Sequence, residues 1–286
     1  MSSPALQLHD IRVTYRSGWL NKTTHTAVNG VSLSIHPGEV LGLIGESGSG
    51  KSTLAYVSAA LLTPDAGTVS ILGKNPKSLS QRQLRSLRKD FQLVFQDPSS
   101  ALNPGQTIYE ILHDVCKLAF AGNDAQDRIK KVLNEVGLTH RQHAMPAHLS
   151  GGEKRRVAVA RLRLLSPKLI LADEPTTGLD AALKADLIDL ILEGREQGCS
   201  YLLISHDLPL VAYAADRIAV MHQGQIVEQF NIDEMHATHH PYTTQLLVNA
   251  GLQHSTNSKI AGFNKINQTT TTTESSSISH STEPQQ

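Results

Sequence analysis

One eight-residue stretch decides the fold class of this chain, and it reads Gly45-Glu46-Ser47-Gly48-Ser49-Gly50-Lys51-Ser52. It fits the pattern GxxxxGK[ST], in which glycines let backbone N–H groups turn toward phosphate oxygens. The apolar run Val40 to Ile44 precedes it as a buried strand, and residues 52–62 follow with the apolar spacing of a helix. The N-terminus of that helix, which is the positive end of its dipole, would point to the same phosphate oxygens. The order of strand, glycine-rich loop and helix therefore predicts a phosphate-binding loop.

The residue types in this loop indicate a nucleotide with a metal ion. Lys51 supplies a mobile cation for the phosphates, and the Ser52 hydroxyl can ligate Mg²⁺. The alternative is a glycine-rich turn without a ligand, which the flanking strand and helix disfavour. The predicted nucleotide-binding residues are Gly45, Glu46, Ser47, Gly48, Ser49, Gly50, Lys51, Ser52 and Thr53.

A second apolar strand ends in two carboxylates. Leu169-Ile170-Leu171-Ala172 is followed by Asp173 and Glu174. In nucleotide-binding α/β sheets the ligand lies at the carboxyl ends of the strands. We therefore expect Asp173 to help hold Mg²⁺ and Glu174 to face an attacking water. Two acidic residues after a strand also describe a solvated turn, and the phosphate loop upstream favours the functional reading.

The composition excludes several classes of protein. The 286 residues carry 26 Lys plus Arg and 26 Asp plus Glu, so the net charge is zero and the basic field of a nucleic-acid binder is missing. The apolar runs are too short to span a membrane. The start of the chain lacks the pattern of a secretory signal, so we expect a cytoplasmic protein. Cys116 and Cys199 stand far apart, as is typical of apolar packing rather than of a metal site.

The pattern along the chain predicts an α/β protein. Alternating apolar residues mark strands before residue 36, and strands at 91–95, 169–172 and 201–205 are interspersed with helices. We expect those helices at residues 108–118, 125–136, 154–165 and 181–196. From residue 254 the composition turns to Ser, Thr, Asn and Gln, which predicts a disordered tail over 254–286.

The stretch Leu149-Ser150-Gly151-Gly152-Glu153 identifies a family. Ser150 and Glu153 fit a helix capping box, which alone would explain them. The two glycines behind the cap leave backbone amides bare, and such a helix start can bind a phosphate supplied by another subunit. Together with the phosphate loop and the acidic strand end, the sequence resembles the ABC transporter ATPases, whose signature motif is LSGGQ.

The resemblance implies a fold and a division of the chain. It implies an α/β P-loop NTPase (RecA-like) core with an N-terminal antiparallel β subdomain and an inserted helical subdomain. The ATPase domain would cover residues 1–253, with the helical subdomain at about 97–165 and a C-terminal extension at about 236–253. Glu153 replaces the commonest glutamine of the signature motif, and Arg163 stands where a leucine is usual.

The resemblance also assigns roles to single residues. Ser150, Gly151 and Gly152 would close over ATP held by the opposite subunit. Gln96 resembles the glutamine that touches Mg²⁺ and the water, although it could be an ordinary amide at a strand end. His206 resembles the histidine that contacts the γ-phosphate.

Two further assignments have structural alternatives. Asp180, in Gly178-Leu179-Asp180, resembles the loop residue that crosses the dimer interface, or it is only a helix cap. Tyr15 matches the aromatic that stacks on adenine, an interaction worth about 1 to 3 kcal/mol. A packing tyrosine is the rival reading for Tyr15, and Trp19 is a second aromatic candidate.

Two motifs resemble those of one group within this family, the oligopeptide, dipeptide and nickel importers. They are Phe95-Gln96-Asp97-Pro98 with Ala101-Leu102-Asn103-Pro104, and His240-Pro241-Tyr242-Thr243-Thr244-Gln245-Leu246-Leu247. The implied protein is a peripheral ATPase at the cytoplasmic face of the cell membrane. Its partners would be two permease subunits, a substrate-binding protein and a second ATPase subunit, either identical or different. A peptide, nickel or a metal–metallophore complex would be the cargo. The rivals are an ABC ATPase without a permease and a nucleotide-binding regulator that does not hydrolyse.

Overall fold

The computed structural model describes residues 3–17, 23–94, 102–120, 124–237 and 239–252. The predictions for Trp19, Gln96 and the tail from residue 254 lie outside these residues. Phe95, Asp97, Pro98 and Ala101 of the first importer motif lie outside them too.

Nine strands among the described residues form two sheets. A three-stranded antiparallel sheet has the order β2-β1-β4, and a six-stranded sheet has the order β5-β6-β7-β3-β8-β9. The first five strands of the larger sheet are parallel, and β9 pairs antiparallel with β8. The strands are β1 (Leu6–Ser17), β2 (Thr23–Ile35), β3 (Val40–Ile44), β4 (Ala66–Ile71), β5 (Phe91–Val94), β6 (Leu169–Asp173), β7 (Ser200–Ile204), β8 (Arg217–His222) and β9 (Gln225–Asn231).

Helices connect these strands. The α-helices are α1 (Lys51–Ser58), α2 (Gln81–Asp90), α3 (Ile108–Ala119), α4 (Ala125–Glu135), α5 (Gly151–Leu165), α6 (Ala181–Leu192), α7 (Leu208–Ala214) and α8 (Pro241–Asn249). Short 3₁₀ helices are η1 (Pro76–Ser78), η3 (Thr139–Arg141), η4 (Pro146–His148), η5 (Glu193–Gln197) and η6 (Ile232–Glu234). None of the helices in the described part of the chain has the length and apolar character needed to cross a bilayer.

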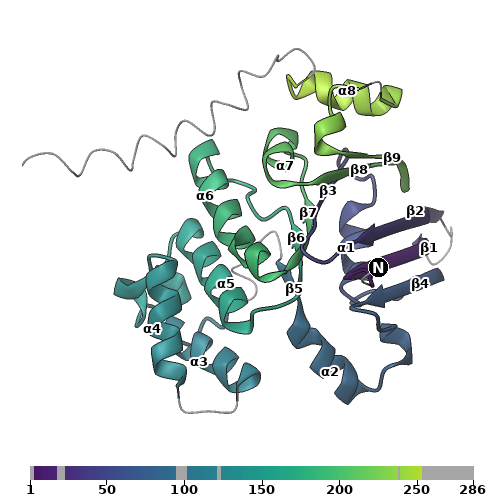
Figure 1. Ribbon diagram of the computed structural model, residues 1–286. Coiled ribbons are helices and arrows are strands. Elements are labelled where there is room, and N and C mark those ends of the chain that lie inside the picture. Colours follow the sequence, from purple (N-terminus) through teal and green to yellow (C-terminus); the bar gives the residue numbers. More distant parts are fainter. Residues whose placement is uncertain (1–2, 18–22, 95–101, 121–123, 238, 253–286) are drawn as a thin grey trace, which may run out of the picture.

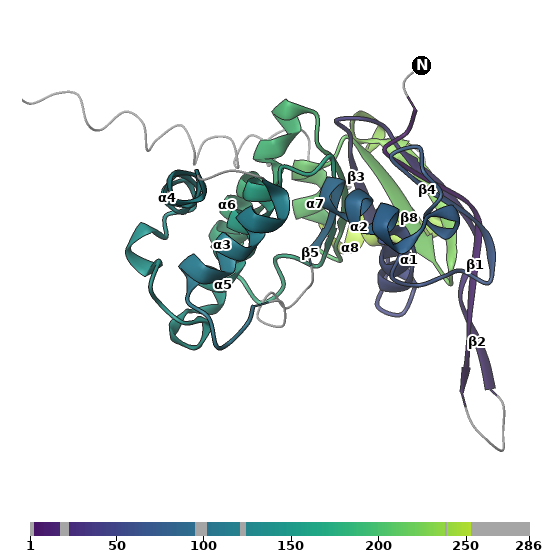
Figure 2. The same cartoon turned by 90° about the horizontal axis from the view of Figure 1, so that it is seen from below.

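The elements form layers around the six-stranded sheet (Figure 1). Helices α3, α4, α5 and α6 lie on one side of it, and the three-stranded sheet lies on the other. The view from below shows the same arrangement, with the β1–β2 hairpin projecting away from the body (Figure 2). Helix α8, at the end of the described chain, lies beside β8 and β9. The antiparallel β part and the α/β core match the predicted fold class.

Successive side chains of the central strands point to opposite faces of the larger sheet, and both faces are covered. On β3, Val40 and Ile44 belong to the core cluster under helices α3 to α6, whereas Leu41 and Leu43 belong to the cluster shared with β1, β2 and α1. Every residue of β3, β6 and β7 is buried. Parallel strands covered on both faces are continuous apolar runs, which is how these three appear in the sequence. This packing fixes the carboxyl ends of the strands as a rigid edge.

Some predicted elements end elsewhere. Helix α1 ends at Ser58 instead of reaching residue 62, because Ala60 takes a left-handed backbone conformation at φ 51° and residues 61 and 62 turn back to the Tyr56 carbonyl. Helix α6 ends at Leu192 and continues as the 3₁₀ helix η5. Both buried cysteines lie in the core, and burial raises the pKa of the Cys199 thiol to about 11.

Candidate active site

The phosphate loop joins β3 to α1 at the middle of the larger sheet, and two of its glycines are required there. A Cβ on Gly45 would lie 2.1 Å from the Met221 carbonyl oxygen, and a Cβ on Gly50 would lie 2.2 Å from that of Ala27. Gly50 also has a φ of 106°, which side chains rarely tolerate. No described side chain caps α1, so its first amides remain available to a phosphate.

Lys51 is held inside the loop. Its Nζ donates to the carbonyl oxygens of Gly45 at 2.7 Å and Glu46 at 2.8 Å, and the residue is 7% exposed. Burial lowers the pKa of the ammonium, while the nearby charges of Glu174, Asp173 and Glu46 oppose that shift. A cation placed among carbonyl groups at the start of a helix is well suited to phosphate oxygens.

Two of the three predicted metal ligands, Ser52 of α1 and Asp173 at the end of β6, lie close together. The Ser52 hydroxyl lies 3.5 Å from Asp173 Oδ1, although the two residues are 121 positions apart. Asp173 is 7% exposed, and burial raises the pKa of its carboxyl. A buried carboxylate beside a hydroxyl is a donor set that Mg²⁺ prefers, because hard cations bind oxygen ligands. The residues present therefore fit Mg²⁺.

Glu174 and His206 contact each other across neighbouring strands. Glu174 Oε1 lies 2.7 Å from His206 Nδ1 and accepts the His206 backbone N–H at 3.0 Å. Its Oε2 accepts the hydroxyls of Thr177 at 3.2 Å and Ser205 at 3.4 Å. Glu174 is largely buried, its backbone has a φ of 50°, and the His206 side chain is 67% exposed. The structure thus holds one carboxylate rigidly and presents an imidazole to solvent beside it.

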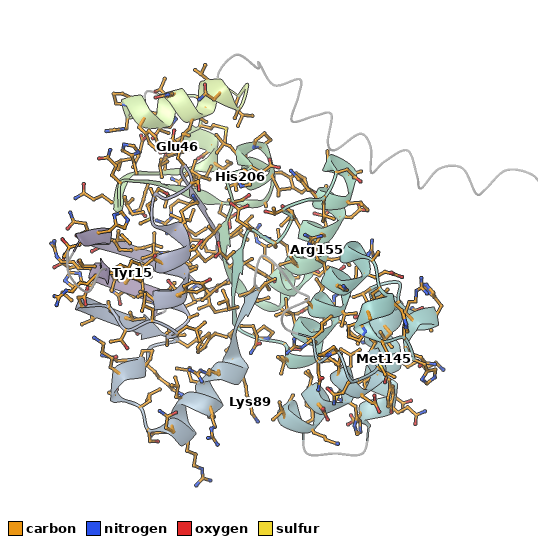
Figure 3. All side chains as sticks on the ribbon, turned by 180° about the vertical axis from the view of Figure 1, so that it is seen from behind. Tyr15, Glu46, Lys89, Met145, Arg155 and His206 are labelled. Carbon is orange, nitrogen blue, oxygen red and sulfur yellow. The ribbon has the colours of Figure 1, made fainter. Side chains whose placement is uncertain are left out.

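Tyr15 lies at the edge of this site, on strand β1. Its hydroxyl is 3.4 Å from the hydroxyl of Thr53, which belongs to the first turn of α1. The residue is 45% exposed, so it is not buried as a core tyrosine would be. Its ring is therefore accessible beside the phosphate loop. Figure 3 labels Tyr15 on the β part of the molecule and His206 on the core.

The Leu-Ser-Gly-Gly-Glu stretch begins helix α5. Ser150 and Glu153 form both bonds of a capping box, and Glu153 Oε1 accepts from Arg141 Nε at 2.7 Å. The backbone bond from Ser150, followed by the Arg141 bond, lowers the pKa of Glu153 to about 2. Both oxygens of the Glu153 carboxylate are therefore hydrogen-bonded, one to Arg141 and the other to the Ser150 N–H of the helix cap. Ser150 and Gly151 are exposed, and a Cβ on Gly152 would meet nothing within 4 Å.

Comparison with known proteins identifies the family. The model of the ABC transporter family matches residues 28–177, just over half of the chain. The chain is 38% identical over 249 residues to the oligopeptide transport ATP-binding protein OppF of Salmonella typhimurium, covering 85% of this chain and 75% of that protein. The chain belongs to the ABC transporter family. It therefore carries the ATP-binding cassette, the ATPase domain of these transporters.

Two further comparisons agree with this family. The chain is 40% identical over 225 residues to the oligopeptide transport ATP-binding protein OppD of Mycobacterium bovis, covering 77% of this chain. The matched part spans only 37% of that relative's length. A solved dimeric ATP-binding cassette in a post-hydrolysis state, bound to ADP and phosphate, superposes with a TM-score of 0.70 at 29% identity. That match covers 79% of this chain and 98% of the other.

The remaining predicted residues of the cassette lie around α5 and α6. Asp180 caps α6 by accepting the Leu183 N–H at 3.0 Å, which is the structural alternative considered for it. Gly178, just before it, has a φ of 79° in a turn that suits glycine. Arg155 of α5 donates to the Thr177 carbonyl, so the two segments are joined directly. Figure 3 labels Arg155 on α5, apart from Met145 in the helical part.

Several residues of the cassette site were not predicted. Ser205 and Thr177 hold the Glu174 carboxylate, and Arg141 holds Glu153. The phenolic oxygen of Tyr242 accepts the backbone N–H of Glu46, inside the phosphate loop, at 3.1 Å. Local pattern gives no signal for such contacts. In the sequence, Tyr242 is only part of an importer motif, and no pattern links it to the loop.

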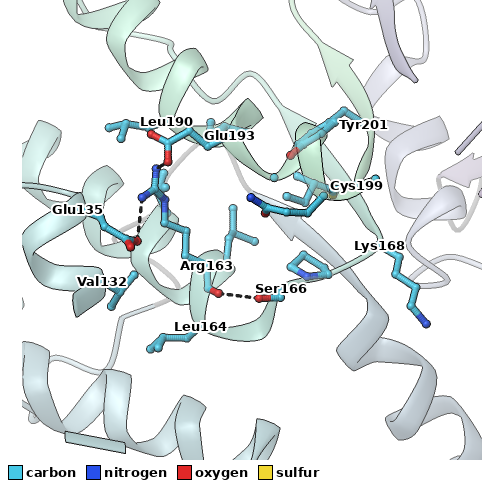
Figure 4. Close-up of a pocket in the computed structure, with 18 of the residues that line it drawn as sticks. Val132, Glu135, Arg163, Leu164, Ser166, Lys168, Leu190, Glu193, Cys199 and Tyr201 are labelled. Atoms are coloured by element: carbon cyan, nitrogen blue, oxygen red, sulfur yellow. Dashed lines mark hydrogen bonds and ion pairs between the residues drawn. The ribbon is translucent and has the colours of Figure 1, made fainter. Parts of the chain in front are cut away.

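A cavity of about 670 Å³ lies away from the phosphate loop, between α4, α5 and the start of β7 (Figure 4). Arg163 stands within it and pairs with Glu135 of α4 at 3.0 Å and with Glu193 of η5. Neither the loop nor His206 lines this cavity. Arg163, which departs from the usual leucine, thus joins the helices of the cassette through ion pairs.

Proposed function

We propose that this chain is the ATP-hydrolysing subunit of an importer and that it powers uptake through partner permeases. One observation carries the proposal. The phosphate loop with Lys51, the acidic pair Asp173 and Glu174, and His206 converge at the carboxyl ends of β3, β6 and β7, which are neighbours in one parallel sheet. Ligands of open α/β sheets bind at that edge.

The loop side of the site would bind the nucleotide. Lys51 and the loop amides of residues 45–53 would hold the phosphates, and Tyr15 would stack on the adenine. Ser52 and Asp173 would hold Mg²⁺, with Gln96 as a further ligand outside the described residues. When bound, Mg²⁺ neutralises charge that develops on the phosphates.

The carboxylate side of the site would carry the chemistry. Glu174 would orient or deprotonate the attacking water, with its position fixed by His206, Thr177 and Ser205. His206, exposed and in contact with Glu174, would hold the γ-phosphate. The protein would thus contribute positioning and electrostatic stabilisation, which dominate phosphoryl transfer.

A second ATPase subunit would complete the site. The bare start of α5 at Ser150, Gly151 and Gly152, together with the loop at Asp180, would face ATP held by the other subunit. The contact of Arg155 with Thr177 supports this, because it ties the two segments into one surface. The partner is a second copy or a homologous chain. Residues 1–253 would form this ATPase domain, with a helical subdomain at about 97–165, an extension at about 236–253 and the tail 254–286 outside it.

The wider assembly follows from the importer assignment. Two permease subunits and a substrate-binding protein would be the partners, and the chain would lie at the cytoplasmic face of the cell membrane, attached through the permeases. The names of the relatives favour a peptide as cargo. Nickel or a metal–metallophore complex is the alternative cargo.

Uptake measurements test the function and the cargo together. We would delete the gene in its host, restore it as wild type or as Glu174→Gln, and measure entry of a labelled tripeptide and of ⁶³Ni²⁺. We expect peptide uptake to be lost on deletion, restored by the wild type and not restored by Glu174→Gln. Loss of nickel uptake instead would assign the other cargo. Unchanged uptake of both would favour an ABC ATPase that works without a permease.

A further inference from the structure

The Gly45–Glu46 peptide group of the phosphate loop is bonded on both sides. Its carbonyl oxygen accepts from Lys51 Nζ at 2.7 Å, and its N–H donates to the Tyr242 hydroxyl oxygen at 3.1 Å. Lys51 and Tyr242 thus act on the two ends of one planar unit. Tyr242 is 196 residues from Glu46, on helix α8 near the end of the described chain. Figure 3 labels Glu46 beneath this helix.

The C-terminal segment holds Tyr242 firmly in this position. The ring is 9% exposed and lies against His222 of β8, with ring centroids 3.9 Å apart. The start of α8 is tied to β9, because Glu228 accepts the His240 N–H at 3.1 Å and contacts His239 Nδ1 at 3.0 Å. The His239 imidazole is almost fully buried. The hydroxyl of Tyr242 therefore approaches the loop from a fixed support.

The same part of β8 also supports the loop directly. The Gly224 N–H, in the turn after β8, donates to the Ser49 carbonyl at 3.0 Å, and Gly45 lies against the Met221 carbonyl. Tyr242 extends this support to the Glu46 amide. Burial raises the pKa of the Tyr242 hydroxyl, so it stays neutral at physiological pH.

We propose that Tyr242 is a positioning residue for ATP binding, because its hydroxyl fixes the peptide group whose carbonyl holds the Lys51 ammonium. Accepting the N–H of a peptide strengthens its C=O as an acceptor. The loop is thereby pre-organised, and less ordering is required when the phosphates bind. The C-terminal helix is on this account part of the nucleotide site. The inference rests on the proposed binding of ATP at this loop.

The test is Tyr242→Phe, which keeps the ring on His222 and removes only the oxygen. We expect the dissociation constant for ADP, measured by titration calorimetry, and the KM for ATP both to rise about two- to tenfold, the value of one hydrogen bond. The kcat at saturating ATP should stay at the wild-type value, because Glu174 and His206 are untouched. The thermal midpoint should change by no more than that of the control.

The matched control is Tyr213→Phe. Tyr213 is an exposed residue of α7, and the substitution also removes a tyrosine hydroxyl bond, to Asp189 of α6 at 2.9 Å. It should leave both KM and kcat unchanged. An unchanged dissociation constant in Tyr242→Phe, with the wild type binding ADP normally, would overturn the inference. So would a fall in kcat at constant KM, or a lower midpoint with unaltered binding. Failure of the wild type itself to bind ADP would instead refute the proposed function.

Discussion

Glu174 Oε1 lies 2.7 Å from Nδ1 of His206 and also accepts the backbone N–H of the same residue, so one oxygen holds both the ring and the chain of its neighbour. The other oxygen faces two hydroxyls, from Thr177 and Ser205. A carboxylate with this many donors keeps one orientation, which a water-positioning group needs. Its partner His206, although its side chain is 67% exposed, is thus contacted at both its ring and its backbone by one carboxylate oxygen.

Glu174→Gln should separate nucleotide binding from hydrolysis. The amide has nearly the same shape but is a far weaker base, so hydrolysis should fall at least about a hundredfold. The ADP dissociation constant should stay within about twofold of the wild type, because Lys51 and the loop are unaltered. The measurements are phosphate release and titration calorimetry. Glu196→Gln, on exposed η5, is the matched control and should be silent. A Glu174→Gln protein with half the wild-type rate would contradict the role of Glu174.

Asp173→Asn should stabilise the nucleotide-free protein while abolishing its activity. Burial raises the pKa of Asp173 in the folded state, so the charged form is favoured less there than in the unfolded chain. The charged Asp173 therefore destabilises the folded wild-type protein at pH values above its folded-state pKa. This destabilisation disappears as the pH falls below the pKa of Asp173 in the unfolded chain. We expect the variant to melt about 1 to 3 °C higher than the wild type at pH 7. The thermal midpoints of the variant and the wild type should converge near pH 3. Calorimetric melting at a series of pH values measures both. A variant that melts lower at pH 7 would show that the contact with Ser52 outweighs the burial.

Glu153→Gln restores the residue common in the signature motif. Because hydrogen bonds to Ser150 and Arg141 lower the pKa of Glu153 to about 2, its stabilising effect is complete above about pH 4.5 and is lost as the pH falls toward 2. A glutamine can keep the capping box but pairs less strongly with Arg141. The midpoint at pH 7 should therefore drop by about 1 to 3 °C, and the difference should vanish at low pH.

The same variant tests where the charge of Glu153 acts. Its carboxylate is bonded to the cap and to Arg141, so ATP turnover should stay within about twofold of the wild type. A severalfold increase in turnover would mean that the negative charge acts on the nucleotide of the facing subunit.

The elements that were predicted correctly are those that local pattern determines. β3, β6 and β7 are continuous apolar runs, and the motifs at their ends mark the phosphate loop and the acidic pair. Strand β4 was not predicted, because its residues are mostly exposed or half-buried and its apolar signal is weak. The contact between Tyr242 and Glu46 depends on the tertiary fold over 196 positions, and no local rule covers that distance.

The last prediction concerns the surface at the start of α5. If Ser150, Gly151 and Gly152 seat the phosphates of a facing subunit, Ser150→Arg should abolish ATP-induced dimerisation, because a bulky side chain would fill that seat. The substitution also removes a helix cap worth about 1 kcal/mol, so folding needs its own control. Ser150→Ala loses the same cap without adding bulk. It should lower the thermal midpoint comparably and still dimerise.

The measurement is size-exclusion chromatography with ATP, with both variants on the Glu174→Gln background so that hydrolysis does not reopen the dimer. Binding of ADP to each monomer should be unchanged, because both substitutions leave residues 45–53 of the phosphate loop unaltered. If the Ser150→Arg protein dimerised as well as the Ser150→Ala protein, the proposed contact of Ser150 with the phosphates of the facing subunit would be refuted. Ser150 would then serve only as the cap of its helix, which its bond with the Glu153 N–H at 3.2 Å already explains.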